Sequence, residues 1–419
     1  MNTRILNIFF IVLSLFCESC VWNEPENSAE YLPLDDSEYP YAGLPRLVIE
    51  TEDFQQIRDR ETETPARLQV YGKDQPEGGI LDLTVKGHGF SSFVGMPKPS
   101  YKIEFFNKLS LLGMHKDKDW VLIANSADRS LLRNFITYKL YDWLGADYSP
   151  HAQFVELFFN RQYQGVYLLT ETVKVGKHRV NICESPSCFL FEKAKYTQPK
   201  DVHFRTRQGN LFLVKSSNKE NPQSVAILKN HIDSLEAFLA GDKKAGMDQW
   251  FDIETFVRFY WTQEFSKNLD GNFYKSIFLT WRQNSPVQFG PVWDFDMGYG
   301  NSNSKSALSP EDWYIRPSPW NRDIIADSVV MERVENFWLE KHQVFEQVSD
   351  TLLHYSEKLS LAAKNEFTRW PTLSENINWA NGKAFHSYGE AVDNLNDWIK
   401  KRIAWIDNNL KGPATPQKQ

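Results

Sequence analysis

The segment Asn268–Asn301, NLDGNFYKSIFLTWRQNSPVQFGPVWDFDMGYGN, constrains the fold more than any other part of the chain. It contains two apolar runs, Ser276–Trp281 and Val287–Trp293, which are separated by the polar residues Arg282–Pro286. Two such runs joined by a short turn of Asn, Ser and Pro predict a β-hairpin. A hairpin brings its two outer ends together, so whatever precedes the first strand meets whatever follows the second.

Three aspartates occupy those outer ends. Asp270 comes just before the first predicted strand, and Asp294 and Asp296 come just after the second. Carboxylates held side by side repel one another unless a cation lies among them or one of them keeps its proton. Each aspartate alone is typical of a turn or a helix cap. Three that converge from both ends of a hairpin instead favour a site for a hard cation such as Mg²⁺, which takes oxygen ligands.

Composition narrows the class of protein. With 419 residues, the chain is long enough for two or three domains or lobes, and a hydrophobic content of 42% is ample for a core. The formal net charge is −7, and the chain contains no extended run of Lys and Arg. These two features argue against the binding of nucleic acid.

Residues 1–20 predict a targeting signal. Arg4 gives the segment a positive start, and the apolar stretch Ile5–Phe16 is too short to span a bilayer. Cys20 resembles the lipidated cysteine of a bacterial lipoprotein signal, with Cys17 as a competing candidate and a plain secretory peptide or an uncleaved anchor as alternatives. We therefore expect export and attachment through a lipid on Cys20 to a bacterial membrane, facing the periplasm or the cell surface.

Two further segments complete the expected organisation of the exported chain. Residues 21–43 are polar and acidic and predict a tether that holds the folded part off the membrane, and residues 412–419 predict a polar tail. Cys183 and Cys188 flank a short turn, and a disulfide between them is consistent with an exported protein.

The order of the patterned segments predicts an α+β fold. Residues 44–172 are rich in predicted strands, whereas 173–411 are mainly helical and include the hairpin. The strand Ser100–Phe106 alternates so that Lys102 points away from its apolar layer. The loop Gly87–Ser92 before it can turn backbone N–H groups toward an anion, with Lys102 behind them. The alternative is an ordinary hairpin with an exposed lysine.

Several other segments carry clear patterns. A helix is predicted over Ser126–Leu144, with Ser126 or Asp128 as its N-cap. The other predicted strands are Phe154–Phe159, Gly165–Thr170, Phe189–Lys193 and Gly209–Lys215, and the later predicted helices are Ser224–Leu239, Phe251–Asn268, Ser328–Glu366 and His386–Leu410. Apart from the hairpin, the strands therefore precede most of the helices.

In this order the segments resemble the spore-coat CotH kinase family, secreted relatives of the protein-kinase fold, and look most like its cell-surface lipoproteins. The resemblance covers most of residues 44–410 and is carried by LPRLVIET, VKGHGFSSFVGMPKPSYKIEF, DRSLLRNFITYKLYDWLG, NRQYQGVYLLTETV, NLDGNFYKS, GPVWDFDMGYGN and WIKKRIAWID. GVYLLTE and GPVWDFD are the most specific of these. The resemblance implies an atypical protein-kinase-like fold with two lobes, a β-rich N-terminal lobe over 44–172 and a mainly helical C-terminal lobe over 173–411.

The resemblance also implies a function, namely transfer of phosphate from ATP to a serine or threonine hydroxyl of a protein acceptor. Lys102 would bind a phosphate, and Glu171 would lie in the hinge whose backbone meets the adenine. The residues that would cover the nucleotide phosphates are Gly87, Gly89, Ser91 and Ser92.

The same resemblance assigns the acidic residues and a divalent metal, Mg²⁺ or Mn²⁺. Asp270 would accept the proton of the acceptor hydroxyl or hold the metal. The other implied metal ligands are Asp294, Asp296 and Asn272. Phosphoryl transfer needs charge neutralisation and in-line positioning, which a lysine and several carboxylates supply.

The chain departs from the family or from ordinary kinases at three places. His88 stands where the family usually has arginine, and Lys275 stands where kinases place an asparagine metal ligand, five residues after the catalytic aspartate. The helix predicted before Gly145 has no glutamate to pair with Lys102. The alternative function is therefore a catalytically inactive scaffold that binds a partner protein or a surface polysaccharide, and a small molecule or glycan is a third candidate acceptor.

Overall fold

The computed structural model describes residues 34–411 apart from 74–75, 90, 242–245 and 375–382. These residues form both sheets and helices, which confirms the mixed α and β content expected from the sequence. The predicted signal with Cys20, most of the predicted tether and the predicted tail lie outside the described residues. Within the described ranges, no helix combines the length and the apolar character that a membrane crossing requires.

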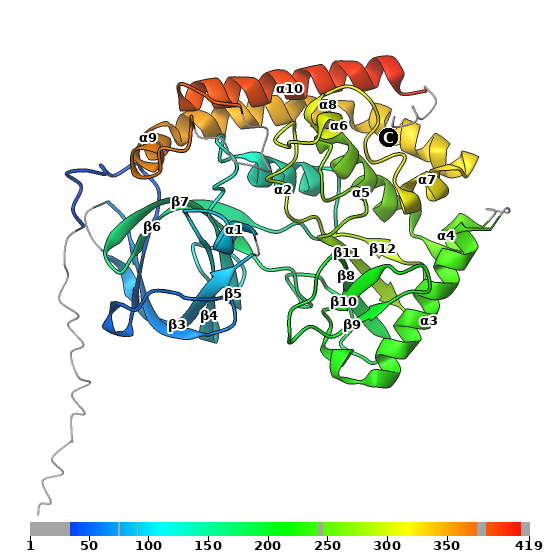
Figure 1. Ribbon diagram of the computed structural model, residues 1–419, viewed down its shortest axis with the longest axis horizontal. Coiled ribbons are helices and arrows are strands. Elements are labelled where there is room, and N and C mark those ends of the chain that lie inside the picture. Colours follow the sequence, from blue (N-terminus) through cyan, green and yellow to red (C-terminus); the bar gives the residue numbers. More distant parts are fainter. Residues whose placement is uncertain (1–33, 74–75, 90, 242–245, 375–382, 412–419) are drawn as a thin grey trace, which may run out of the picture. The chain divides into compact units, whose positions relative to one another are not determined.

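Seven strands form a closed barrel (Figure 1). Its order is β1-β2-β3-β4-β5-β7-β6, and β1 and β6 close it as a parallel pair in which Arg46 lies opposite Glu156. The bounds are β1 (Arg46–Thr51), β2 (Thr64–Tyr71), β3 (Pro76–His88), β4 (Ser100–Leu109), β5 (Asp117–Ile123), β6 (Ala152–Phe159) and β7 (Gln162–Glu171). A closed barrel is not typical of a kinase lobe, and the two-lobe arrangement therefore stays a prediction.

Strand β4 shows how residue alternation builds the barrel. Tyr101, Ile103 and Phe105 are buried together in the hydrophobic cluster inside the barrel. Lys102 and Glu104 lie on the opposite face of the strand and are only partly buried. Consecutive side chains of a strand point to opposite faces, so the expected direction of Lys102 is confirmed.

A second sheet of five strands has the order β12-β11-β8-β10-β9. The bounds are β8 (Cys188–Ala194), β9 (His203–Arg205), β10 (Leu211–Val214), β11 (Ile277–Arg282) and β12 (Gln288–Phe289). β11 pairs antiparallel with β12 on one side and with β8 on the other, so the predicted hairpin is confirmed and is built into a larger sheet. At the start of β8, Cys183 and Cys188 form the disulfide considered from the sequence.

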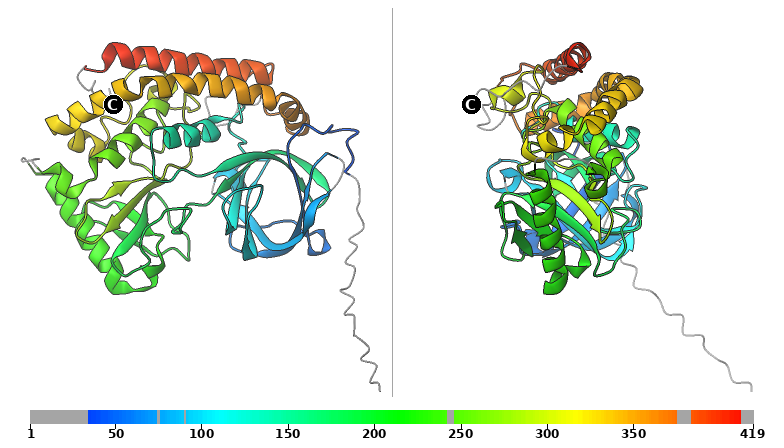
Figure 2. Two further views of the ribbon diagram at one scale, coloured as in Figure 1. Left: turned by 180° about the vertical axis from the view of Figure 1, so that it is seen from behind. Right: turned by 90° about the vertical axis from the view of Figure 1, so that its right-hand side faces the viewer.

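Most of the described helices follow β10 in the chain. The helices are α1 (Ser91–Val94), α2 (Arg133–Trp143), α3 (Pro222–Leu239), α4 (Met247–Trp250), α5 (Ile253–Ser266), α6 (Lys305–Leu308), α7 (Pro319–Ile325), α8 (Ser328–Lys358), α9 (Ser360–Arg369) and α10 (Tyr388–Asn409), with 3₁₀ turns η1 (Glu52–Phe54) and η2 (Ser217–Glu220). Figures 1 and 2 show the long helices α8 and α10 side by side, and α2 and α5 pack against α8 and against each other.

The second strand of the hairpin is shorter than expected. The prediction of a strand over Val287–Trp293 was wrong in its length, because only Gln288–Phe289 pairs with β11. The next residue, Gly290, has a φ of 112°, which leaves the strand region. Pro291 after it has no N–H to donate to a strand ladder.

Helix α2 begins later than the predicted start at Ser126. The Asp128 carboxylate accepts the backbone N–H groups of Ser130 at 3.0 Å and of Arg133 at 2.8 Å. These bonds hold residues 128–132 in a turn, and the helix begins at Arg133. Short polar side chains that bond the local backbone favour turns over helix interiors, which explains the difference.

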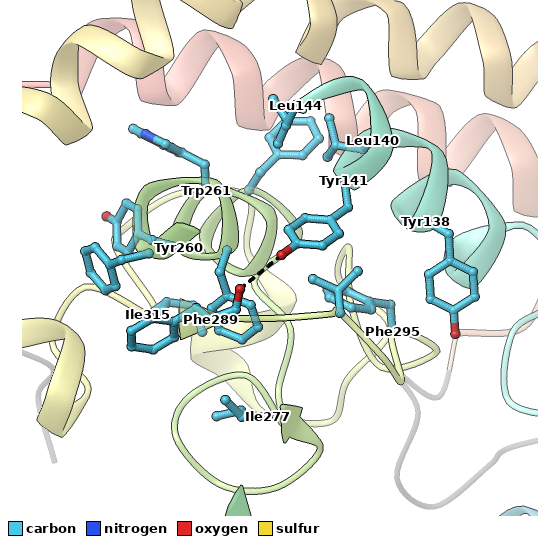
Figure 3. Close-up of a cluster of buried hydrophobic side chains, with 14 of the residues drawn as sticks. Tyr138, Leu140, Tyr141, Leu144, Tyr260, Trp261, Ile277, Phe289, Phe295 and Ile315 are labelled. Carbon is cyan, nitrogen blue, oxygen red and sulfur yellow. Dashed lines mark hydrogen bonds between the residues drawn. The ribbon is translucent and has the colours of Figure 1, made fainter. Parts of the chain in front are cut away.

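The second sheet shares a hydrophobic core with α2 and α5 (Figure 3). Trp261 of α5 and Phe289 of β12 are buried in it, and the Tyr141 hydroxyl of α2 donates to the Phe289 carbonyl oxygen at 3.3 Å. Phe295, which lies between Asp294 and Asp296 in the sequence, is completely buried in the same core. Its burial anchors the loop that carries the two aspartates.

Candidate active site

The three aspartates lie on the wall of one cavity of about 150 Å³. Asp270 comes from the turn between α5 and β11, and Asp294 and Asp296 come from the loop after β12. The convergence predicted from the hairpin is therefore confirmed. The other described residues that line the cavity are His88, Gly89, Ser92, Ser100, Ile123, Asn134, Lys275, Trp293 and Met297.

The backbone around this cavity is held in a conformation that L-residues disfavour. Positive φ angles occur at Phe273 (54°), Ser276 (56°), Asp294 (69°) and Tyr299 (52°). Such residues persist only where the surrounding structure fixes them, and they cluster at functional sites. One fixing contact is the side-chain amide of Asn268, which donates to the Asp294 carbonyl oxygen at 3.2 Å.

Lys275 forms ion pairs with two of the carboxylates. Its Nζ lies 2.9 Å from Asp270 Oδ2 and 3.4 Å from Asp294 Oδ2. The hydroxyl of Ser276 also donates to Asp294 Oδ2, at 3.2 Å. The negative charges of Asp294 and then Asp270 raise the pKa of Lys275, so its side chain is a cation at neutral pH.

Two carboxyl groups of the cavity, those of Asp270 and Asp296, hold their protons more tightly than usual. Burial, followed by the charge of Asp294, raises the pKa of Asp270 to about 6. The same two causes raise the pKa of Asp296 well above its ordinary range. Burial and like charges penalise further negative charge here, so one ammonium does not balance three carboxylates. Groups shifted in this way are typical of functional sites.

The predicted phosphate loop reaches the cavity through a sharp turn. Gly89 has a φ of 76°, and a Cβ at this position would overlap the Ser92 side chain, so the turn requires glycine. The Ser92 hydroxyl donates to the His88 carbonyl oxygen at 3.1 Å. Burial, with a contribution from Lys102, lowers the pKa of His88 to about 4. His88 is therefore neutral at pH 7 and adds no charge to the loop.

The other two residues predicted in this loop have different positions. Gly87 lies within β3, where a Cβ would overlap the ring of Phe93. Ser91 is the first residue of α1. The structure therefore brings Gly89 and Ser92 to the cavity, and it uses Gly87 for the close packing of Phe93.

Lys102 has two acidic partners that the sequence did not reveal. Its Nζ lies 3.0 Å from Glu104 Oε2 and 3.2 Å from Asp119 Oδ2. Burial alone would lower the pKa of Lys102, but attraction to Asp119 and Glu104 outweighs burial and raises the pKa. Lys102 shares the outer face of β4 with Ser100, which lines the cavity. No glutamate from a helix is needed to hold this lysine.

Glu171 ends β7, and its side chain is completely buried. The carboxylate is paired with Arg179 and with Nδ1 of His151, the latter at 3.0 Å, and the backbone N–H of Glu171 donates to the His151 carbonyl oxygen at 3.0 Å. That Glu171 lies in a hinge whose backbone meets the adenine stays a prediction. His151 also lines a separate cavity of about 520 Å³ that contains none of the three aspartates.

An asparagine reaches the cavity, but it is a different one from the asparagine proposed by sequence. Asn272 is hydrogen-bonded to the side chain of Tyr314, and it is not among the described residues that line the cavity. Asn134 of α2 does line it, and its Oδ1 accepts the Phe295 N–H at 2.7 Å. The only sequence signal for Asn134 is a polar residue inside the apolar pattern LLRNFI.

The donor atoms of the cavity fit a metal that arrives with a polyphosphate. Among the described residues, no group of three or more His, Cys, Asp and Glu side chains could hold a metal ion alone. The ammonium of Lys275 already contacts both Asp270 and Asp294. Mg²⁺ commonly takes one or two carboxylates plus phosphate oxygens, and Asp294 and Asp296 can supply that share.

The sequence profile of the family described as "CotH kinase protein" matches residues 83–406, which is most of the chain and includes every residue placed at the cavity above. A comparison with curated proteins finds no match.

Proposed function

Because the chain belongs to the CotH kinase family, we propose that it is an atypical kinase that transfers phosphate from ATP to a serine or threonine hydroxyl of a protein. The observation that carries the proposal is the convergence of Asp270, Asp294 and Asp296 on one cavity beside the Gly89 turn. Phosphoryl transfer depends on positioning and on neutralising charge, and this cavity offers groups for both.

In this proposal Asp270, Lys275 and the Gly89 backbone at the cavity, and Lys102 on the neighbouring strand β4, have distinct tasks. Asp270 accepts a hydrogen bond from the acceptor hydroxyl and takes its proton as the oxygen bonds to the γ-phosphorus and the bond to the bridging oxygen breaks. The backbone at Gly89 approaches the phosphates closely because no side chain intervenes. Lys275 supplies a fixed positive charge beside Asp270. Lys102 supplies a second one, held in place by Asp119.

Mg²⁺ or Mn²⁺, bound with ATP, would be held by Asp294 and Asp296 and would neutralise charge on the phosphate oxygens. The positive φ of Asp294 and the hydroxyl of Ser276 fix the direction of the Asp294 carboxylate. Burial of Phe295 fixes the loop between the two ligands. The protein thus orients the ligands before the metal and nucleotide arrive, which lowers the cost of binding.

An apolar layer close to this region suits the nucleotide base. Leu190 of β8 and Phe278 of β11 are buried together, and Val173 and Trp293 pack against them. Val173 follows Glu171 by two residues, and Trp293 also lines the cavity. We place the base against this layer, with the barrel as the N-terminal lobe and the part from residue 173 as the C-terminal lobe.

Thermal unfolding of the purified protein with Mg·ATP or Mn·ATP tests binding. We expect a rise in melting temperature of several degrees at nucleotide concentrations about a hundred times the dissociation constant, since binding then adds about 2.7 kcal/mol. Asp294→Asn should abolish this rise, whereas Asp397→Asn, on the exposed face of α10, should keep it. Absence of any shift with either metal at millimolar ATP would overturn the proposal.

Transfer of labelled phosphate to a generic protein acceptor tests catalysis. Asp270→Asn should lower the rate about 10²–10⁴-fold, the usual contribution of a positioned proton acceptor, while the thermal shift with Mg·ATP remains. A variant that keeps the wild-type rate would remove Asp270 from the proposed mechanism.

One observation favours a second candidate, a scaffold that binds a surface partner or polysaccharide without catalysis. Lys275 and Lys102 are both already paired with carboxylates, so neither is a free phosphate ligand. The two assays separate the candidates, because a scaffold that retains the nucleotide would show the thermal shift but no transfer. Lipid attachment at Cys20 is a further proposal, and labelling with a fatty acid, lost in Cys20→Ser, tests it.

A further inference from the structure

Lys275 is the one cation that contacts the aspartates of the cavity directly within the part of the chain that the structure describes. Its Nζ is within 3.4 Å of both Asp270 and Asp294, as ion pairs of 2.9 Å and 3.4 Å. A third of its side chain is exposed, and Lys275 lines the cavity. A ligand entering the cavity therefore meets this ammonium together with the carboxylates.

The position of Lys275 is built by the local backbone. The N–H groups of Tyr274 and Lys275 both donate to the Asp270 carbonyl oxygen, at 3.1 Å and 3.3 Å. Phe273 before this turn and Ser276 after it have positive φ angles. The turn that starts at Asp270 therefore brings the Lys275 ammonium back to the side chain of Asp270. The position of the ammonium is set by this turn.

Protein kinases hold two Mg²⁺ ions with two side chains. One is an aspartate in the loop after a β-hairpin, and the other is an asparagine that follows the catalytic aspartate. Here the position five residues after Asp270 is Lys275. Asn272, which is two residues after Asp270, bonds Tyr314 instead. The ammonium lies 2.9 Å from Asp270 Oδ2 and 3.4 Å from Asp294 Oδ2. A divalent ion would therefore be repelled more strongly on the carboxylate of Asp270 than on that of Asp294, because repulsion between like charges grows as they approach.

We propose that Lys275 replaces the second metal ion, so that this site takes a single divalent cation. The proposal rests on the proposed function above and specifies the metal content of that same site. Asp294 and Asp296 share the one divalent ion with the nucleotide phosphates, and Lys275 supplies the remaining positive charge between Asp270 and the phosphates. The Asp270 carboxylate is thereby left to the acceptor hydroxyl and is not a metal ligand.

Counting bound Mn²⁺ tests the proposal without any turnover. The protein is saturated with a non-hydrolysable ATP analogue and titrated with Mn²⁺, and free Mn²⁺ is followed by electron paramagnetic resonance. We expect one Mn²⁺ per chain for the wild type and one for Lys275→Arg, which keeps the charge. Lys275→Asn restores the kinase-type ligand and should bind two. Lys401→Asn, an exposed change on α10, should bind one.

Each outcome decides between the alternatives. Two Mn²⁺ ions in the wild type, or a single ion in a folded Lys275→Asn variant that still binds the analogue, would overturn the proposal and leave the proposed function intact. No Mn²⁺ and no analogue bound to the wild type would overturn both. If Lys275→Asn does not fold, as judged by its melting curve, the wild-type count and the Lys275→Arg count still decide the matter.

Discussion

The buried ion pair between Lys98 and Glu366 should be among the contacts on which the folded state depends most. The Lys98 Nζ lies 2.8 Å and 2.9 Å from the two carboxylate oxygens of Glu366 and also donates to the Ala124 carbonyl oxygen at 3.0 Å. Glu366 Oε2 accepts the Val166 N–H at 2.7 Å. Lys98 is 1% exposed and Glu366 is 3% exposed. The pair therefore joins the segment before β4 to α9, and the bond from Val166 adds β7 to this contact, through groups that are almost completely buried.

The expected magnitude follows from this burial. Burial lowers the pKa of Lys98 and raises the pKa of Glu366, and in each group the charge of the partner opposes the effect of burial. Removing one partner of a buried pair costs about 3–5 kcal/mol, because it leaves an uncompensated charge. At about 2.1 cal/mol/K per residue, a cooperative unit of the size of Leu34–Gln419 has an unfolding entropy of about 0.8 kcal/mol/K, so Lys98→Met should lower the melting temperature by about 4–6 °C.

The assay is thermal unfolding of Lys98→Met, Glu366→Gln and the double variant. The double variant should lose less than the sum of the two single losses, because it removes both charges, and the amide oxygen of the new glutamine can still accept the Val166 N–H. Lys401→Met, which breaks the exposed pair with Asp397, serves as a control and should cost about 0.5 kcal/mol or less. Single losses as small as this control, or fully additive losses, would refute the reasoning.

Three other predictions concern stability. Burial lowers the pKa of His231 to about 4, so the folded protein should lose up to about 3 kcal/mol of stability as pH falls from about 6.5, the pKa in the unfolded state, to 4. In His231→Phe, the free energy of unfolding should lack this dependence on pH. An unchanged dependence in the variant would contradict the account. Gly290→Ala should destabilise by at least about 2 kcal/mol, because φ is 112° and the Cβ would overlap the Tyr141 hydroxyl; Tyr141→Phe should restore only part of the lost melting temperature, and full recovery would exclude backbone strain. Cys183→Ser should lower the free energy of unfolding by about 2 kcal/mol by the chain-entropy relation, and its melting temperature should equal that of the reduced wild type. A wild type whose melting temperature does not change with reductant would disprove this prediction.

The features predicted well from sequence are those whose parts lie close together in the chain. The hairpin of β11 and β12 and the meeting of Asp270 with Asp294 follow from one segment, Asn268–Asn301. The direction of Lys102 follows from strand alternation alone. In each case the period of apolar residues and one short turn determine the geometry, and no distant partner has to be known.

The features that sequence did not predict depend on pairings between distant residues. The barrel closes where β1 pairs in parallel with β6, and nothing in the alternation of either strand names the other as its neighbour. The Asp119 partner of Lys102 comes from the next strand, and the Glu366 partner of Lys98 comes from a helix near the other end of the chain. Local patterns specify which face of an element is buried, but not which element covers it.

The charge state of the cavity is a separate matter from its composition. From the sequence, three aspartates near one another required either a cation or a retained proton, and both were left open. The structure combines them: Lys275 lies against Asp270 and Asp294, and burial still raises the pKa of Asp270 to about 6 and that of Asp296 above its usual range. One ammonium is thus insufficient for the three carboxylates, and a divalent ion held by Asp294 and Asp296 would relieve part of the remaining repulsion. The ion pairs of Lys275, which stands where protein kinases place an asparagine ligand, are what make a single metal ion the expected content of the site.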